Sequence, residues 1–239
     1  GTSARIAHLS SVHARGDTRI LIKECNTLAR AGYDVALVVA DGLGDEQRDD
    51  VRIFDVGGSR GRLERMTGAT RRVAARAMSI DASLYHLHDP ELLPLALDLK
   101  RRGKRVIYDA HEDLSAQILS KPYLHPALRR PIAGMAAAIE RFACRRVDHV
   151  VAATRTIRDK FLRQGIPATD VNNFPMLGEL ETGVDRNATA RNVCYIGSIS
   201  LARGIKETVA ALEMCASGAR LNLGGRFDQE LVKAEIETT

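Results

Sequence analysis

Residues 84–112 read LYHLHDPELLPLALDLKRRGKRVIYDAHE, and this stretch predicts the fold. Two short apolar runs, 82–89 and 105–111, have the length and composition of strands. Between them a helix is predicted to begin at Asp89-Pro90, to turn its leucines toward the core and to stop at Gly103. A strand, a helix and a second strand form a βαβ unit, and such a unit joins parallel strands.

The same alternation of strand and helix runs through most of the chain. Further strands are predicted at residues 4–11, 34–41, 51–56, 149–154, 170–174, 192–199 and 221–223. A helix is expected to begin at Asp17 or Thr18 and to stop at Gly32. Alternation of this kind predicts an α/β fold, in which helices cover both faces of a doubly wound parallel sheet.

Residues 176–191 break the alternation, because they are polar and acidic and have no apolar periodicity. We interpret them as an interdomain linker. A first Rossmann-like domain is therefore expected over residues 1–175, and the opening βαβ of a second over residues 192–239. The second segment is well short of the ~100 residues of an independent domain, so this domain is expected to be truncated in the chain.

The composition narrows the classes of function. A net charge of +5 favours an anionic partner, but 4% aromatic residues and no tryptophan leave little material for stacking on bases, so no nucleic-acid partner is expected. The four scattered cysteines form no C-x-x-C pair, which favours a reducing cytosol over a disulfide framework. Since no apolar run approaches a membrane span and no signal-peptide pattern begins the chain, a cytoplasmic location is expected.

Two common nucleotide-binding motifs are missing. The turn after the first predicted strand, residues 11–17, contains one glycine where a dinucleotide fingerprint needs G-x-G-x-x-G. The glycine cluster 57–61 has the wrong spacing for a phosphate cradle, and a flexible loop explains it better. The sequence therefore argues against a dehydrogenase and against a P-loop kinase.

His86 and His88 lie on one face of a predicted strand, because side chains alternate along it, and several metallohydrolase motifs open with this spacing. Such a site would need another histidine two residues after Asp89, where Glu91 stands instead. We therefore favour a histidine that lines a cleft and an Asp89 that caps the next helix, and we expect no metal ion.

Two further strand ends carry candidate site residues. At the first, His111 lies beside Asp109 and Glu112, at the edge where open α/β sheets bind ligands, although an exposed histidine next to a capped turn remains an equal alternative. At the second, Arg203 and Lys206 flank a strand-to-helix turn. Cations at a helix N-terminus oppose the dipole, which favours a bound anion there.

Two segments are strongly basic. Residues 60–76 contain six arginines and one acid, Glu64, and residues 128–146 contain five arginines. Basic amphipathic stretches of this kind lie on anionic lipid surfaces, and solvated helix faces explain them equally well.

Together these motifs resemble those of the family 4 glycosyltransferases, whose GT-B fold has two Rossmann-like domains that face each other across a cleft. The resemblance covers nearly the whole chain. It rests on residues 16–20 with Lys23-Glu24, and on residues 88–93, 106–112, 173–175 and 195–204.

The resemblance implies transfer of a sugar from a nucleotide-sugar donor to a glycan or lipid-linked acceptor, with retention of configuration, in cell-surface polysaccharide biosynthesis. It implies that His111 is the catalytic residue beside the transferred sugar. Donor-binding positions are Gly16, Gly197, Ser198, Arg203 and Lys206, and acceptor-side positions are Asp17, Arg19, His88 and Glu112.

One departure from the family pattern concerns Ser198, which stands where many relatives have an arginine. Lys206 is therefore expected to supply, with Arg203, the second cation that binds the diphosphate. The paired-glutamate motif of the family would lie beyond Thr239, and the chain alone is therefore expected to be inactive. No metal and no other cofactor is implied. A peripheral position at the inner face of the cell membrane would suit a lipid-linked acceptor.

Other functions stay open at this point. An epimerase or phosphorylase can use the same two-domain architecture, and a non-catalytic module of this fold could bind a glycan or a lipid. The positive charge alone would also suit RNA.

Overall fold

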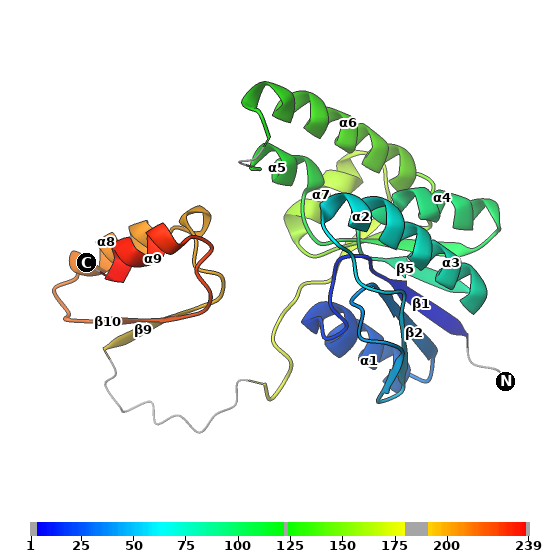
Figure 1. Ribbon diagram of the computed structural model, residues 1–239, viewed down its shortest axis with the longest axis horizontal. Coiled ribbons are helices and arrows are strands. Elements are labelled where there is room, and N and C mark those ends of the chain that lie inside the picture. Colours follow the sequence, from blue (N-terminus) through cyan, green and yellow to red (C-terminus); the bar gives the residue numbers. More distant parts are fainter. Residues whose placement is uncertain (1–3, 122–123, 180–190, 238–239) are drawn as a thin grey trace. The chain divides into compact units, whose positions relative to one another are not determined.

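The computed structural model describes residues 4–121, 124–179 and 191–237 (Figure 1). The chain divides into two compact units, Gly1–Phe174 and Pro175–Thr239. Most of the predicted linker, residues 180–190, lies outside the described residues, so the linker stays a prediction.

A single sheet of eight strands forms the centre of the first unit. The strands are β1 (Arg5–Leu9), β2 (Asp34–Val39), β3 (Glu46–Arg48), β4 (Val51–Asp55), β5 (Leu84–Leu87), β6 (Arg105–Ala110), β7 (His149–Ala152) and β8 (Ala168–Asp170). Their order in the sheet is β3-β4-β2-β1-β5-β6-β7-β8. β2, β4 and β3 lie between β1 and one edge of the sheet. The chain then returns to the centre, and β5, β6, β7 and β8 follow one another toward the other edge. Ligands of such sheets bind at this reversal, beyond the carboxyl ends of the strands.

The predicted parallel α/β fold is confirmed, with two differences. β3 was not predicted and pairs with β4 in the antiparallel sense. It is three polar residues long, so it carries no apolar periodicity that a sequence pattern could reveal.

The last strand of the first unit is β8 at Ala168–Asp170, whereas residues 170–174 were predicted. The later residues leave the sheet because side chains of another element bind their backbone. Arg19 donates to the carbonyl of Val171 and Lys23 donates to that of Phe174.

Helices cover both faces of the sheet. In chain order they are η1 (Thr18–Cys25), α1 (Asn26–Arg30), α2 (Arg62–Glu64), η2 (Arg65–Ala69), α3 (Thr70–Ile80), η3 (Pro90–Leu92), α4 (Leu93–Arg101), α5 (Leu114–Leu119), α6 (Pro126–Cys144) and α7 (Arg155–Arg163). η1 and η2 are π-helices, and η3 is a 3₁₀ helix. The first helix begins as expected, because the Asp17 carboxylate accepts hydrogen bonds from the backbone N–H groups of Arg19 and Ile20.

The two faces of the sheet hold separate cores. Ala7 and Leu9 face the larger core, which includes buried residues of α3, α4, α6 and α7. The smaller core lies under η1 and α1, where Ile20, Leu21 and Cys25 pack on β2 and β4. Because side chains alternate along β1, His8 points to the face of the smaller core. It thereby lies on the same side of the sheet as η1.

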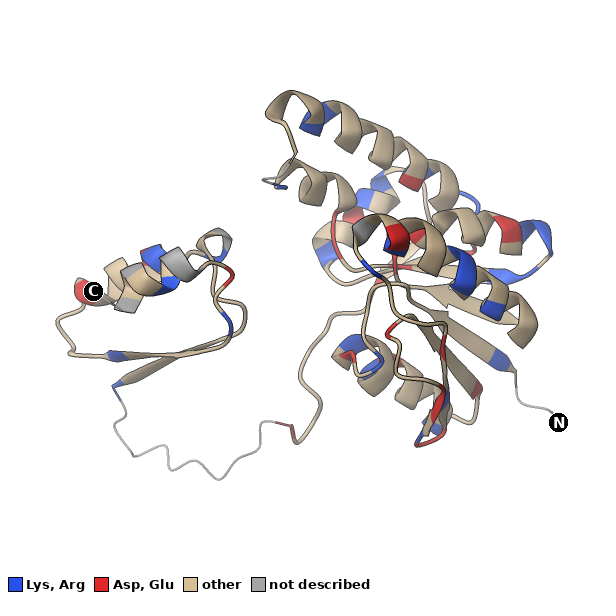
Figure 2. Ribbon diagram, viewed as in Figure 1, with Lys and Arg blue, Asp and Glu red and all other residues tan. Residues whose placement is uncertain are grey.

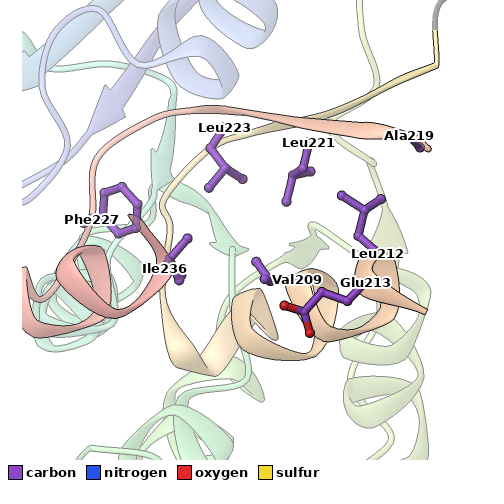
Figure 3. Close-up of a pocket in the computed structure, with 8 residues that line it drawn as sticks. All are labelled: Val209, Leu212, Glu213, Ala219, Leu221, Leu223, Phe227 and Ile236. Atoms are coloured by element: carbon purple, nitrogen blue, oxygen red, sulfur yellow. The ribbon is translucent and has the colours of Figure 1, made fainter. Parts of the chain in front are cut away.

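The second unit begins with the predicted βαβ arrangement. β9 (Asn192–Ile196) pairs in parallel with β10 (Arg220–Gly224), and η4 (Leu201–Arg203) and α8 (Ile205–Glu213) connect them. α9 (Glu230–Glu237) follows. Ile199, Ile205 and Val232 form a small core, and a cavity of about 580 Å³ opens between α8, β10 and α9. Figure 3 shows Leu221, Leu223 and Val209 at this cavity, so its lining is largely apolar.

Candidate active site

A cavity of about 460 Å³ opens beyond the carboxyl ends of β1, β5 and β6, at the reversal in strand order. Its lining is mostly polar and comes from the loop after β1, from the start of η2, from the β5–η3 junction and from the segment that runs from β6 to just beyond α5. The lining residues are Val12, His13, Arg65, His88, Asp89, Pro90, Glu91, Tyr108, His111, Glu112, Leu114, Gln117 and Lys121.

A buried carboxylate, Asp109 at the end of β6, organises the floor of this site. Its side chain is 0% exposed and accepts two hydrogen bonds from the Arg19 guanidinium, at 2.9 and 2.8 Å. His88 Nδ1 lies 3.2 Å from Asp109 Oδ2, and His111 Nε2 lies 3.1 Å from the same oxygen. Burial opposes ionisation, yet these hydrogen bonds hold the pKa of Asp109 well below its usual range.

His111 lies between this buried charge and the cavity. Its side chain is 19% exposed and lines the cavity, while Nε2 is held by Asp109 and lies 3.3 Å from Nδ1 of His88. A carboxylate behind an imidazole fixes the orientation of the ring and stabilises a positive charge on it or next to it. The arrangement therefore suits a group that orients a sugar or stabilises positive charge.

His13 is a site residue that the sequence analysis missed. Its Nδ1 lies 3.2 Å from Asp17 Oδ2, and its Nε2 lies 3.4 Å from Asp89 Oδ1. The hydrogen bond with Asp17 raises the pKa of His13, and the same bond lowers that of Asp17. The ring centroids of His13 and His111 are 4.9 Å apart. The spacing His13-x-x-x-Asp17, directly after a predicted strand, was the available signal.

The expected capping role of Asp89 is wrong. Asp89 precedes η3, but its side chain makes no capping hydrogen bond. It accepts instead from Ser10 Oγ at 2.9 Å and from the backbone N–H of Ser11 at 2.6 Å. Pro90 supplies no N–H at the first helical position, and the donors at the end of β1 lie close because β1 and β5 are neighbours. Asp89 therefore ties the loop after β1 to the cavity.

The predicted acceptor-side residues divide into two groups. His88 and Glu112 line the cavity, and Glu112 accepts a hydrogen bond from Gln117. Arg19 and Asp17 are not among its lining residues: the Arg19 guanidinium is buried beneath it, and Asp17 caps η1. Gly16, predicted to approach the donor, lies exposed in the same loop of the first unit.

The other predicted donor-binding residues lie together at the carboxyl end of β9. Gly197 has a φ of 144° and Gly225 a φ of 153°, and a Cβ on Gly225 would lie 1.7 Å from the carbonyl oxygen of Gly197. Only glycine fits a backbone contact this close. Ser198 is exposed beside it.

The two predicted cations occupy the turn that follows. Arg203 is exposed and ends η4, and Gly204, with a φ of 72°, is the residue before α8. Lys206 is exposed on the first turn of α8. The N-cap residue of α8 is Gly204, which has no side chain to cap the helix, so both cations lie next to the N-terminal backbone N–H groups of α8 along the chain.

Within the part of the chain that the structure describes, two groups of side chains have the composition of a metal site. The first comprises His8, Glu24, His86 and His88, and the second comprises His88, Asp109 and His111. In the second group the carboxylate already balances the guanidinium of Arg19. The local sequence pattern brings together only His86 and His88, and nothing in it brings His8 or Glu24 to them.

Similar structures have been solved. Sucrose-phosphate synthase from Thermosynechococcus elongatus superposes with a TM-score of 0.68 at 16% identity, over 98% of this chain and 67% of that one. The Anabaena protein HepE, in complex with UDP and glucose, gives 0.64 at 15% identity, over 98% and 65%. The catalytic domain of starch synthase IV from Arabidopsis thaliana gives 0.61 at 10% identity, over 100% and 71%.

The chain thus spans about two thirds of the length of these proteins, and at such identities the likeness concerns the fold. Among curated proteins, none matches the sequence. The sequence profile of Glycosyltransferase Family 4 matches residues 15–174, which contain most of the cavity described above. By this match the chain belongs to Glycosyltransferase Family 4, and its fold is that of the GT-B glycosyltransferases.

Proposed function

We propose that this glycosyltransferase moves a sugar from a nucleotide-sugar donor to a glycan or lipid-linked acceptor with retention of configuration, as a step in cell-surface polysaccharide synthesis. The observation that carries the proposal is the pair His111 and Asp109. An imidazole held by a buried carboxylate at 3.1 Å lines a polar cavity at the ligand-binding edge of the sheet.

The cavity of the first unit is proposed to hold the acceptor. His13, Glu91, Glu112 and Gln117 supply donors and acceptors around it, which suits the hydroxyl groups of a sugar. Burial and the neighbouring Asp89 raise the pKa of Glu91.

The proposed chemistry follows from where charge develops. Cleavage of the anomeric C–O bond gives the sugar oxocarbenium character and leaves negative charge on the departing diphosphate. His111, with the Asp109 carboxylate behind it, would stabilise the positive charge. Arg203, Lys206 and the N-terminus of α8 would stabilise the negative charge, so no metal is needed to hold the diphosphate.

Retention is proposed to arise because the acceptor hydroxyl attacks the sugar on the same face from which the leaving group departs. The oxygen of the leaving phosphate takes the proton of the acceptor hydroxyl as the new glycosidic bond forms. This route requires no separate general base. His111, which Asp109 positions, is therefore proposed to orient the sugar and not to act as a base.

The test is the anomeric configuration of the product. The full-length protein would be incubated with a panel of nucleotide sugars and with lipid-linked and glycan acceptors, and the new linkage would be assigned by NMR. The expected product keeps the anomeric configuration of the donor. An inverted linkage would refute retention. If the protein released an epimerised sugar in the absence of acceptor, its function would be that of an epimerase instead of a transferase.

The second part of the proposal is a peripheral position on the cytoplasmic membrane surface. None of the helices among residues 4–121, 124–179 and 191–237 is long and apolar enough to span a bilayer. α6 (Figure 1) instead presents an apolar stripe to the outside: Leu128, Met135, Ile139 and Phe142 are each more than half exposed. Arg146 lies over the Phe142 ring at 3.6 Å.

Basic residues accompany this stripe (Figure 2). A cavity of about 330 Å³ beside Phe142 is lined by Lys100, Arg101 and Arg146, and Lys100 also pairs with Asp148. Two arginines in this lining suit an anionic headgroup. Because the exposed apolar stripe lies on α6, we assign the larger part of the membrane contact to this helix.

Replacing Met135 and Ile139 together by aspartate is expected to weaken binding to anionic vesicles at least ~10-fold, since both side chains lose the apolar area that would enter the interface. Vesicle co-sedimentation at low salt measures this. Leu162→Asp, an exposed leucine on α7, is the matched control and should bind as the parent does. Equal binding of the parent to neutral and anionic vesicles would refute the membrane contact.

A further inference from the structure

Beneath the cavity, four side chains from three elements converge. His8 lies on β1, His86 lies opposite it on β5, His88 follows β5, and Glu24 comes from η1. One nitrogen or oxygen atom of each lies within 4.8 Å of those of the other three. Glu24 Oε2 is 3.9 Å from His8 Nδ1, 3.8 Å from His86 Nδ1 and 3.9 Å from His88 Nε2. His8 Nδ1 and His88 Nε2 are 2.9 Å apart.

The polar atoms of this cluster are unusually short of partners. His8, His86 and His88 are 0%, 7% and 2% exposed. Among the residues that the structure describes, His8 Nε2, His86 Nε2 and both carboxylate oxygens of Glu24 accept or donate no hydrogen bond. Glu24 Oε1 lies 3.2 Å from Arg19 Nε, whereas Glu24 Oε2 faces the three histidines. Buried polar atoms are nearly always hydrogen-bonded, so the unpaired Glu24 Oε2 indicates a ligand.

The tautomer of His88 points to the same conclusion. Its Nδ1 lies 3.2 Å from Asp109 Oδ2, and the tautomer with the proton on Nδ1, facing this carboxylate, has a lone pair on Nε2. That lone pair faces His8 Nδ1 and the Glu24 carboxylate. A histidine that gives one N–H to a carboxylate and turns its other nitrogen toward further ligands is the usual arrangement around a bound metal.

The ligand set selects the class of metal. Three imidazoles and one carboxylate suit zinc and similar borderline transition metals, whereas Mg²⁺ and Ca²⁺ prefer oxygen. Tetrahedral Zn²⁺ with bonds of ~2.0–2.1 Å separates its ligand atoms by about 3.3 Å. Four of the six separations between the ligand atoms, 2.9 to 3.9 Å, lie on both sides of this value.

We infer that His8, Glu24, His86 and His88 bind one Zn²⁺. All four positions are filled by protein, so the site is structural and fastens η1 to the sheet, next to the contact of Arg19 with Asp109. His86 also lines an adjoining cavity of about 490 Å³, which gives the ion a route of entry. The inference is independent of the proposed transfer reaction, and it departs from the sequence-based expectation that no metal binds.

The experiment begins with metal uptake by the parent protein, prepared without a histidine tag and stripped with a chelator. Competition with a chromophoric chelator is expected to show one Zn²⁺ per chain, bound with a Kd below ~1 µM. Co²⁺ in its place should give the strong visible bands of a tetrahedral site. Absence of uptake by the folded parent would overturn the inference.

Variants then locate the ion. Glu24→Gln and His86→Gln keep the size of the side chain and should each weaken Zn²⁺ binding by ~100-fold or more, while circular dichroism of the metal-free proteins stays that of the parent. His149→Gln is the control, because His149 bonds to Thr169 on β8 and lies outside the cluster. If His149→Gln weakened Zn²⁺ binding as much as the cluster variants do, the binding would be adventitious and the site would be overturned. The same holds if Glu24→Gln and His86→Gln both left the Zn²⁺ affinity within twofold of the parent.

Discussion

Replacing Arg203 by alanine in the full-length protein is expected to lower kcat/KM by roughly ten- to more than hundredfold. Charge-assisted hydrogen bonds are worth ~1.5 to 3 kcal/mol, and 1.4 kcal/mol corresponds to a factor of ~10 in rate. Arg203 is exposed at the turn before α8, where the N-cap residue is Gly204, so its loss should affect the diphosphate and leave the fold intact. Steady-state kinetics with the identified donor measure the change.

Two further variants test the reason for this loss. Arg203→Lys should recover part of the activity, since it restores the charge without the planar fork that bonds two phosphate oxygens at once. Arg220→Ala removes another exposed arginine of the second unit, at the opposite end of β10 from Gly224, and should leave kcat/KM within twofold. If Arg203→Ala also stayed within twofold while folded, the turn would not be the phosphate site.

Replacing Asp109 by asparagine is expected to lower the free energy of unfolding by about 3 kcal/mol. Removal of one partner from a buried ion pair costs ~3 to 5 kcal/mol, because the other charge is left buried and uncompensated. The value should fall at the lower end, since Glu24 Oε1 lies 3.2 Å from Arg19 Nε and can ionise to replace the lost charge. Urea unfolding at neutral pH measures the difference.

The control for Asp109 is Asp98→Asn. Asp98 pairs with Arg102 on the surface, where both side chains are well exposed, and such pairs contribute ~0 to 1 kcal/mol. The pH dependence gives a second check. The pKa of Asp109 is lowered in the folded state, so its stabilisation is present above the ordinary value of 3.8 and is lost as the pH falls below it. The parent and Asp109→Asn should therefore converge in acid, and a constant difference would contradict the argument.

The sequence predicted the fold because its signals are local. Apolar runs, helix ends and glycine stops within residues 84–112 were sufficient to indicate parallel strands joined by a helix, and β5, α4 and β6 have this arrangement. The Arg203 turn was visible for the same reason, since a strand, a glycine and two cations follow one another within a few residues.

Other features depend on residues that are far apart in the chain. β3 was missed because its three polar residues become a strand only by pairing with β4, and the segment after Asp170 leaves the sheet because Arg19 and Lys23 bind its backbone. Asp89 was expected to cap a helix, but its partners Ser10 and Ser11 reach it across the pairing of β1 with β5.

The sequence by itself therefore determined the α/β class, the family and the strand ends at which site residues lie. Only the tertiary structure decided which side chains meet there. His8 and His86 become neighbours through the register of two strands nearly eighty residues apart, and Glu24 reaches them because η1 packs on that face of the sheet. Register and packing are set by the burial of the whole core, so no local pattern of residues encodes the cluster.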